Sequence, residues 1–425
     1  MERIAFEVEF VTPCFLGGAD NTNTAEWRAA SIRGQLRWWL RAVAGGKFAG
    51  DLQKVVDAET RLFGSTNASG SVRLRVGPTP SGALSRGTVD PYPRNCGPEE
   101  LLRRSGGDPR NKKELARVSL GARPSNPINY LAYGCLNFVK PKGATHGRVE
   151  AVRPAIAPGE VATFEVRLVR PLSDDDRELL ARSLWAWLHL GGIGARCRRG
   201  LGSLALRHAQ TLGTAWPSPL LEPPGTPADF IAAAKWASGL GSVEPTHGQP
   251  ADWSHFSSKS RILVSATSCR TWDNALELAG IWLIAFRRRY GHPEDSRVVA
   301  TAPLAQRDYV WAAPNARAAD RFSNVPDRAG FGLPLPFDRT TVVTWGDGKR
   351  DARRASPLLI HIARIGEGNY HPVLTHLAAR LTPDAMKLVF KDWPATAKKV
   401  SFEQENVVSW FLDDLARKKL VTEIS

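Results

Sequence analysis

Fourteen residues, GGIGARCRRGLGSL (191–204), combine five glycines with three arginines and contain no acidic residue. Arginine presents fork-shaped donors that suit phosphate, and glycine leaves backbone N–H groups open to close approach. A dinucleotide fingerprint does not fit, because Cys197 stands where its third glycine belongs and a helix-like stretch precedes the turn. A tight helix-to-strand connection needs one or two glycines. Five favour a phosphate-binding turn, whose candidate residues are Gly192, Gly194, Arg196, Arg198, Arg199 and Gly200.

A second block without acidic residues runs from Arg28 to Gly50, and its five basic residues are Arg28, Arg33, Arg37, Arg41 and Lys47. Three of the arginines are spaced at i, i+4 and i+8, so they share one face of a helix. Like charges at this spacing repel one another unless something negative lies alongside. Trp38, on the polar side of the same helix, either stacks on a base or packs against another subunit. The alternative to a binding site is a solvated helix face. Two such blocks favour a groove for a polyanion.

Composition agrees with a polyanionic partner. The 425 residues contain 57 Lys plus Arg against 42 Asp plus Glu, a net charge of +15. This excess favours nucleic acid over an anionic membrane, because no run of about 18 apolar residues occurs. The start, MERIAFEVEF, does not have the layout of a signal peptide. Five scattered cysteines without a C-x-x-C pair indicate neither disulfides nor a zinc site, so we expect free thiols, the cytoplasm and no cofactor.

Periodicity predicts the elements that must position the two basic blocks. Alternating apolar residues predict strands, and apolar residues at i, i+3, i+4 and i+7 predict helices. A helix with Ser31 as its N-cap carries the first block, and a second helix over 174–190 leads into the glycine-rich turn. Strands at 4–10, 72–76, 161–169 and 203–207 complete the order strand, helix, strand, strand, helix, strand. This is the split β-α-β, ferredoxin-like plan.

The rest of the chain predicts a second copy of that plan. Residues 1–208 form the first domain, with a polar insertion at about 77–150, and 209–258 are a linker and connecting segment. Residues 259–425 read as a degenerate second domain that begins with the strand RILVSAT and ends with the helix EQENVVSWFLDDLARKKL. VLTHLAARL fits a strand or a helix. The predicted fold class is α+β, with tandem ferredoxin-like (RRM-like) domains and a glycine-rich loop in the first.

Several stretches resemble a known family. FLGGADNTNTAEWRAASIRGQLRWWLRA, followed far downstream by GGIGARCRRGLGSL, resembles the RAMP superfamily of CRISPR effector subunits. T-P-x-F-L-G-G-A-D, A-E-W-R, S-I-R-G-Q-L-R-W-W and YLAYG (130–134) are most similar to subunit one of the type III-B (Cmr) complex. The match is dense over the first 45 residues and over 185–205, and thinner in the second half.

The resemblance implies a non-catalytic subunit that caps a ribonucleoprotein filament in antiviral defence. Such a subunit contacts the 3′ part of the guide CRISPR RNA, or the single-stranded target RNA paired with it, and packs on other RAMP subunits. Carried onto this chain, the RNA path is lined by residues of both basic blocks, Arg33, Arg37, Arg41, Arg196, Arg198 and Arg199.

Two other functions stay open at this stage. The first is a ribonuclease of the same superfamily, in which Asp20 in the loop after the first strand, or His189 beside the glycine turn, takes part in cleavage. Against it, a loop aspartate commonly bonds its own backbone, and a lone histidine on an apolar helix is commonly packed. The second is an interaction protein whose basic faces pair with acidic neighbours.

Overall fold

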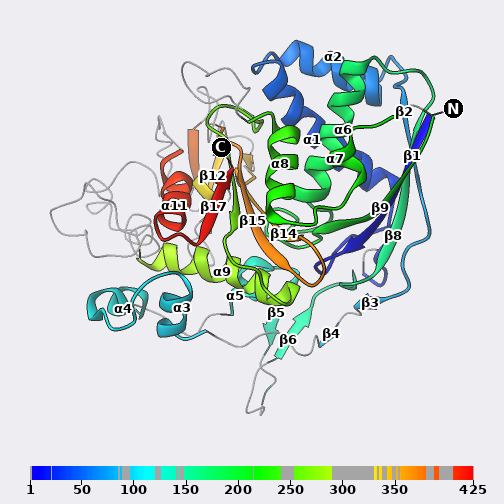
Figure 1. Ribbon diagram of the computed structural model, residues 1–425. Helices are drawn as coiled ribbons and strands as arrows, with labels where there is room; N and C mark the ends of the chain where they lie inside the picture. Colours follow the sequence, from blue (N-terminus) through cyan, green and yellow to red (C-terminus); the bar gives the residue numbers. More distant parts are fainter. Residues whose placement is uncertain are drawn as a thin grey trace.

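The computed structural model of the chain describes most of both predicted domains. The described residues are 2–20, 22–84, 87–88, 96–119, 126–139, 142, 148–213, 215–240, 253–289, 330–332, 335–336, 342–346, 351–352, 355–379, 387–391 and 405–424. Two antiparallel four-stranded sheets and the helices on them dominate this part (Figure 1). In the residues so described, no helix is long and apolar enough to cross a membrane.

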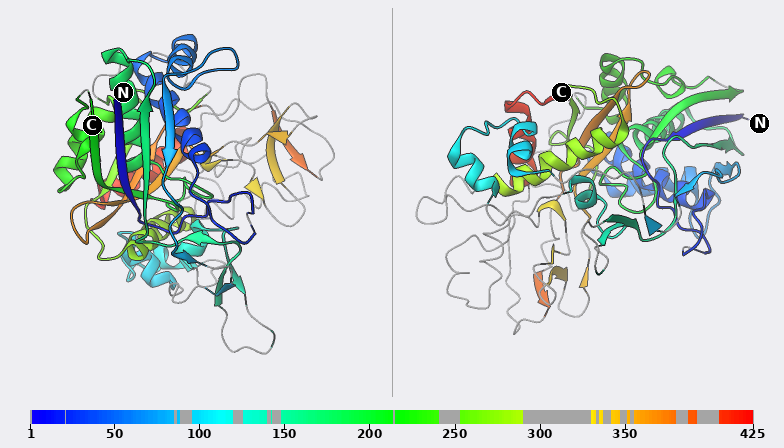
Figure 2. Two further views of the ribbon diagram at one scale, coloured as in Figure 1. Left: turned by 90° about the vertical axis from the view of Figure 1, so that its right-hand side faces the viewer. Right: turned by 90° about the horizontal axis from the view of Figure 1, so that it is seen from below.

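The first sheet comes from the N-terminal half. Its strand order is β2-β8-β1-β9, and the strands are β1 (Glu2–Phe10), β2 (Val72–Val76), β8 (Val161–Leu168) and β9 (Leu204–Leu212). Ile4, Phe6, Val8 and Phe10 of β1 are buried as the sequence predicts, and Glu9 is buried as well. Phe6 stacks on its cross-strand partner Phe164 with ring centroids 4.7 Å apart. The helices α1 (Ala29–Lys47), α2 (Leu52–Phe63) and α6 (Asp174–Leu190) belong to this half. The left view of Figure 2 shows the outer face of the sheet, away from α1 and α6.

The second sheet repeats this order of elements. Its strand order is β14-β15-β10-β17, and the strands are β10 (Arg261–Ser265), β14 (Leu358–Arg364), β15 (Tyr370–His376) and β17 (Val421–Ile424). The helix α9 (Trp272–Arg289) follows β10, and α11 (Glu405–Arg417) precedes β17. The stretch VLTHLAARL, which left the choice between strand and helix open, contributes its first residues to β15.

The two halves stack in four layers, which are the first sheet, α1 with α6, the second sheet, and α9 with α11 (Figure 1). α6 is therefore buried almost all round, including Trp185 and Trp187. Both faces of β14 are covered as well, since Leu359 packs in the core of the first half and Ile360 in the core of the second. This stacking brings the second half against the glycine-rich turn that follows α6.

The segment 209–258, predicted as a linker, is partly helical. β9 extends into it, and α7 (Ser218–Leu221) and α8 (Pro227–Ser238) follow. Phe230 of α8 packs on Trp185 of α6, with ring centroids 5.6 Å apart. α8 starts with a capping box between Thr226 and Asp229, a signal that is visible in the sequence.

The described helices of the 77–150 insertion pack against the second half of the chain. Its helices α3, α4 and α5 contact α9, and Arg104 forms an ion pair with Glu277 of α9 at 2.6 Å. The described elements of this segment and its flank are β3 (Ala83–Leu84), β4 (Gly87–Thr88), α3 (Pro98–Arg104), α4 (Lys112–Ser119), α5 (Pro127–Leu131), β5 (Leu136–Val139), β6 (Arg148–Ala151) and β7 (Ala155–Ile156). The remaining strands are β11 (Leu335–Pro336), β12 (Val342–Gly346), β13 (Asp351–Ala352) and β16 (Lys387–Lys391).

Candidate nucleic-acid interface

The arginine stripe of α1 is held by α2, a helix that the sequence reading did not include. Arg37 Nε donates to Glu59 Oε1 at 2.5 Å, and Arg41 Nε lies 3.8 Å from Glu59 Oε2. Arg33 donates to the backbone carbonyl of Phe63. The negative partner that such a stripe needs is thus the buried carboxylate of Glu59. One carboxylate between two arginines leaves positive charge at the surface, where 46% of the Arg41 side chain is exposed.

The middle of α1 meets the glycine-rich turn in a cavity of about 200 Å³. We call it the Trp38 cleft, and its lining residues are Gly34, Gln35, Trp38, Trp39, Arg41, Gly191, Gly192, Cys197, Arg198 and Leu359. The Arg198 guanidinium lies over the Trp38 ring, 4.6 Å from its centroid, and Trp39 meets the same ring edge-on. The structure therefore brings together four of the predicted residues, Trp38, Arg41, Gly192 and Arg198.

Close packing requires the glycines of the turn, which gives them a structural reason beside the phosphate binding that the sequence predicts. At Gly192 an added Cβ would lie 2.9 Å from the Gly202 carbonyl oxygen, and at Gly194 it would lie 2.8 Å from that of Phe15. At Gly200 the φ is +85° and a Cβ would lie 2.6 Å from the Leu276 side chain of the second half. Positive φ and such distances exclude ordinary side chains.

Backbone donors of the turn are also engaged by protein. The N–H of Ala195 donates to the Phe15 carbonyl at 2.9 Å, and the N–H of Ile193 donates to the Gly202 carbonyl at 3.0 Å. The N–H of Arg199 donates to the Arg196 carbonyl at 2.7 Å. These three N–H groups are therefore not available to a phosphate. The predicted phosphate-binding role of Gly192, Gly194 and Gly200 stays a prediction, beside that of the arginine side chains.

The three arginines of the turn point to different places. Arg196 is exposed, and its Nε donates to the Tyr133 carbonyl at 2.8 Å. Arg198 lies partly buried in the Trp38 cleft, and its Nη1 donates to the Ser356 carbonyl at 2.8 Å. Arg199 turns toward the second half, where Nη2 donates to the Phe331 carbonyl at 3.4 Å and burial lowers the guanidinium pKa to about 10. We therefore leave Arg199 out of the surface path predicted for RNA.

These arginines bond backbone carbonyls and not carboxylates. Within the described residues, no carboxylate lies within ion-pair distance of Arg196, Arg198 or Arg199. Burial also lowers the pKa of Arg198, because removal of a guanidinium from water disfavours its charged form. An external anion would relieve that cost. Cys197 gains no reactivity from its two arginine neighbours, because burial raises the pKa of its thiol.

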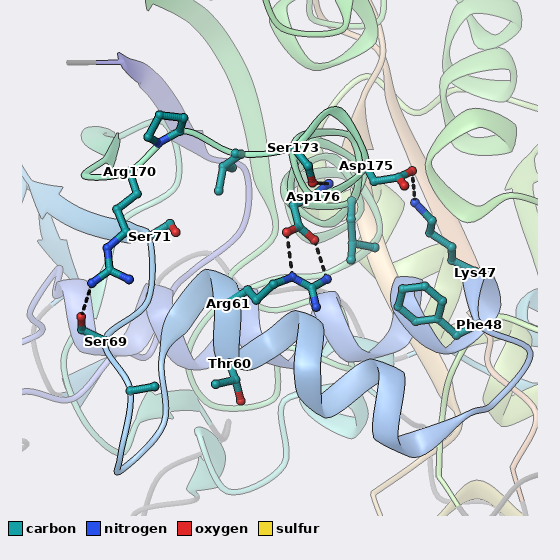
Figure 3. Close-up of a pocket in the computed structure, with 14 residues that line it drawn as sticks. Lys47, Phe48, Thr60, Arg61, Ser69, Ser71, Arg170, Ser173, Asp175 and Asp176 are labelled. Carbon is teal, nitrogen blue, oxygen red and sulfur yellow. Dashed lines mark hydrogen bonds and ion pairs between the residues drawn. The ribbon is translucent and has the colours of Figure 1, made fainter.

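Lys47 and Arg28, at the two ends of α1, lie outside the Trp38 cleft. Arg28 occupies the N-cap position of α1, and its guanidinium is 3.4 Å from the hydroxyl of Ser31, which is within the first turn and not the N-cap. Lys47 Nζ forms an ion pair with Asp175 at 2.7 Å (Figure 3). Of the five basic residues in this block, only Arg41 lines the cleft.

The cavity at Lys47 has a volume of about 590 Å³ and is lined by paired charges. Arg61 donates twice to the Asp176 carboxylate, at 2.8 and 2.9 Å, and Arg170 donates to Ser69 Oγ at 3.0 Å (Figure 3). Two carboxylates offset two of the three cations, Lys47 and Arg61, so the cavity keeps an excess of one positive charge, at Arg170.

Asp20 and His189, the candidates for catalysis, both have structural partners. The Asp20 carboxylate accepts hydrogen bonds from the backbone N–H groups of Thr22 and Asn23, both at 3.1 Å, and from the Asn23 side chain at 2.9 Å. These bonds lower the pKa of Asp20 and form a loop turn. His189 is buried and stacks on Trp185, with ring centroids 4.7 Å apart, and burial lowers its pKa to about 3.

Two residues of this region escaped the sequence reading. Glu59 had a signal, because Asp51 caps a helix whose apolar residues Val55, Ala58 and Leu62 follow helical spacing. Tyr133 lies within the YLAYG motif that carries the family resemblance, but the sequence does not show that 68% of this residue is exposed in the turn between α5 and β5.

Comparison with known proteins agrees with these sequence motifs. Residues 7–205 match the model of the RAMP superfamily. The chain is 25% identical over 390 residues to CRISPR system Cmr subunit Cmr1-1 of Pyrococcus furiosus, covering 91% of each chain. It is 28% identical over 210 residues to Cmr1-2 of the same organism, covering 49% of this chain and 96% of that relative.

Solved structures with a similar chain include apo Cmr1 from Pyrococcus furiosus, at 19% identity and a TM-score of 0.47 over 100% of this chain and 99% of that one. Another is a cryo-EM structure of the type III-B Cmr-beta complex bound to cognate target RNA, at 13% identity and a TM-score of 0.44 over 98% and 99% of the two chains. The likeness to the RAMP superfamily rests on the sequence matches and not on these structural similarities. The predicted resemblance is confirmed.

Proposed function

Because the chain resembles the RAMP superfamily and, within it, subunit one of the type III-B Cmr complex, we propose that it is an RNA-binding subunit of such a CRISPR effector complex. Its partners are the guide CRISPR RNA, single-stranded target RNA and other RAMP subunits. It caps the assembly near the 3′ region of the guide and works in the cytoplasm.

The observation that carries the RNA-binding part is the Trp38 cleft. An exposed guanidinium, an aromatic ring and a partly buried guanidinium meet there, from Arg41, Trp38 and Arg198. Arginine forks bind phosphate, and an aromatic face stacks on any base, so this set suits a single strand without regard to sequence. The absence of a carboxylate beside Arg198, within the described chain, supports an anion that comes from outside.

We also propose that each half is a ferredoxin-like unit. The strand orders β2-β8-β1-β9 and β14-β15-β10-β17 support this, since both place the first strand of the half between its third and its fourth. In such a unit the helix after the first strand and the turn before the last strand lie on one side of the domain. The Trp38 cleft is formed by those two segments in the first half.

We propose no catalytic role for the subunit. The bonds of Asp20 to its own loop and the burial of His189 against Trp185 favour structural functions for the two acid–base candidates of the ribonuclease alternative. The test is incubation of the purified chain with end-labelled RNA, with and without Mg²⁺. Intact RNA is expected, and discrete cleavage that disappears in Asp20→Ala would establish the ribonuclease instead.

RNA binding itself is tested by fluorescence anisotropy with a labelled 20-nucleotide oligouridine over a salt series. Three cations, Arg41, Arg196 and Arg198, predict a slope of log affinity against log salt near −2, at about 0.7 per phosphate. Arg41→Ala should weaken binding and reduce the slope, whereas Arg110→Ala, an exposed arginine paired with Asp108, should change neither. If the chain bound no RNA at 50 mM salt, the interaction-protein alternative would replace this proposal.

A further inference from the structure

Tyr133 is an exposed aromatic ring beside the glycine-rich turn. It lies in the turn between α5 and β5, and 68% of it is exposed, the largest value among the large apolar and aromatic residues of the described chain. A single exposed ring is common on protein surfaces, and this one is informative because the cation Arg196 contacts the same residue.

The Arg196 side chain is held by a hydrogen bond to the backbone of Tyr133. Its Nε donates to the Tyr133 carbonyl at 2.8 Å, and its Nη2 lies over Gly134, 3.6 Å from where a Cβ would be. Arg196 also has a φ of 61°, a left-handed conformation that is strained for a residue other than glycine. Such strain is held only where the surroundings enforce it, and it often accompanies a functional position. One of the five guanidinium donors is used, and the others stay available.

Arg153 adds a second cation to the same turn. The N–H of the preceding residue, Val152, donates to the Cys135 carbonyl at 2.9 Å, which places Arg153 beside residues 133–135. Both Arg153 and Arg196 act electrostatically on the Cys135 thiol, where they oppose the rise in pKa that burial causes. In the part of the chain with described positions, neither guanidinium has a carboxylate partner.

We propose that Tyr133, Arg153 and Arg196 form a second RNA contact, the tyrosine platform, at which a base of a single strand stacks on Tyr133 while the two guanidinium groups bind the neighbouring phosphates. The proposal rests on the proposed function. An exposed ring in the same turn as two cations without a described carboxylate partner fits a stacked base of a polyanion, because a protein partner would need acidic groups placed to match both arginines.

The tyrosine platform continues from the Trp38 cleft along the glycine-rich turn. Arg196 precedes Arg198 by two residues, so their Cα atoms are at most about 7 Å apart. Arg198 contacts Trp38 and Arg196 contacts the Tyr133 turn. The turn thus separates two aromatic groups that an RNA strand meets in succession, one from α1 and one from the 77–150 insertion. This gives that insertion a binding role that the sequence did not reveal.

The test compares variants of the full chain in anisotropy titrations with labelled 20-nucleotide oligouridine and oligoadenosine. Tyr133→Ala should raise the dissociation constant about fivefold or more for both RNAs and leave the salt slope unchanged, because no cation is lost. Tyr133→Phe keeps the ring and should stay within twofold of wild type. Arg196→Ala should make the slope shallower by about 0.7. Leu52→Ala, which removes another exposed apolar side chain, is the control and should bind like wild type.

Three results would overturn the tyrosine platform. If Tyr133→Ala binds RNA with wild-type affinity while Trp38→Ala binds more weakly, the tyrosine platform is contradicted and the proposed function is not. Loss of co-purifying RAMP subunits from Tyr133→Ala at unchanged RNA affinity assigns the ring to a protein contact. Equal weakening by Tyr133→Phe and Tyr133→Ala excludes stacking. A wild-type chain that binds neither RNA contradicts the proposed function itself, and thermal melting of each variant verifies its fold.

Discussion

Two cavities along α1 differ in how their cations are neutralised. At the C-terminal end, Lys47 and Arg61 have carboxylate partners in Asp175 and Asp176. In the Trp38 cleft, Arg198 bonds only the Ser356 carbonyl and the Trp38 ring among its described neighbours. Arg198 thus has no carboxylate partner among the described residues, whereas Arg41 of the same cleft shares the Glu59 carboxylate with Arg37, at 3.8 Å from Arg41. A basic stretch therefore indicates a polyanion site only where acids from other elements do not approach it.

The largest expected effect is a loss of folding stability at low pH, because buried neutral histidines support the glycine-rich turn that lines the Trp38 cleft. His361 Nδ1 donates to the Gly191 carbonyl at 2.6 Å, and His189 lies near it. Burial lowers the pKa to about 3 for His189 and to about 4 for His361 and His376. The unfolded chain, with histidine pKa values near 6.5, then binds more protons between pH 6.5 and 4, so stability falls as the pH falls through this window.

Urea unfolding at several pH values measures this loss, which is expected to reach about 1.4 kcal/mol per pH unit for each such histidine. His361→Asn, which retains a donor toward Gly191, should flatten the dependence. A free energy of unfolding that stays constant from pH 7 to 5 would contradict the burial of these rings.

Gly200→Ala should destabilise the fold by about 1–3 kcal/mol, because the new Cβ combines a φ of +85° with a 2.6 Å approach to Leu276. Gly34→Ala is the matched control, since it lies within α1 and a Cβ there meets nothing within 4 Å. This change should be neutral or stabilising by about 0.5–1 kcal/mol. Urea unfolding at pH 7 decides, and equal effects of the two changes would show that the turn does not need its glycine for packing.

Trp38→Ala should sharpen the contrast between the cavities by removing the ring over which the Arg198 guanidinium lies. A lost base–aromatic stack of about 1–3 kcal/mol corresponds to a decrease in RNA affinity of about fivefold or more. Trp38→Phe should recover most of the affinity. Unchanged binding by Trp38→Ala, measured by anisotropy with oligouridine, would indicate that the ring packs against another subunit.

Local periodicity was enough to predict much of the fold. The helix over 174–190 has the predicted bounds, because its N-cap Ser173 and its apolar spacing are both encoded locally. The helix of the first basic block begins at Ala29, two residues before the expected N-cap, since Arg28 adopts the extended cap conformation without a side-chain cap. α8 lay hidden in a segment whose prolines and glycines resemble a linker.

The candidate site was harder to predict, because it depends on distant residues. Glu59 on α2 neutralises part of the arginine stripe, and Ser356 and Phe331 of the second half accept bonds from Arg198 and Arg199. Spacing along the chain carries no information on such partners. The convergence of Trp38 with Arg198 was predictable only through the order of strands, which places the first helix beside the last turn.

The most direct test of the central claim compares two double variants in anisotropy titrations with labelled oligouridine over a salt series. The double variant Arg41→Ala, Arg198→Ala removes two cations from the Trp38 cleft. The double variant Lys47→Ala, Arg61→Ala removes two cations from the cavity at Lys47. The first should lose affinity about tenfold or more at 100 mM salt, with a slope shallower by about 1.4, whereas the second should stay within twofold of wild type. Equal losses in the two double variants, or none in either, would contradict the assignment of RNA to the Trp38 cleft.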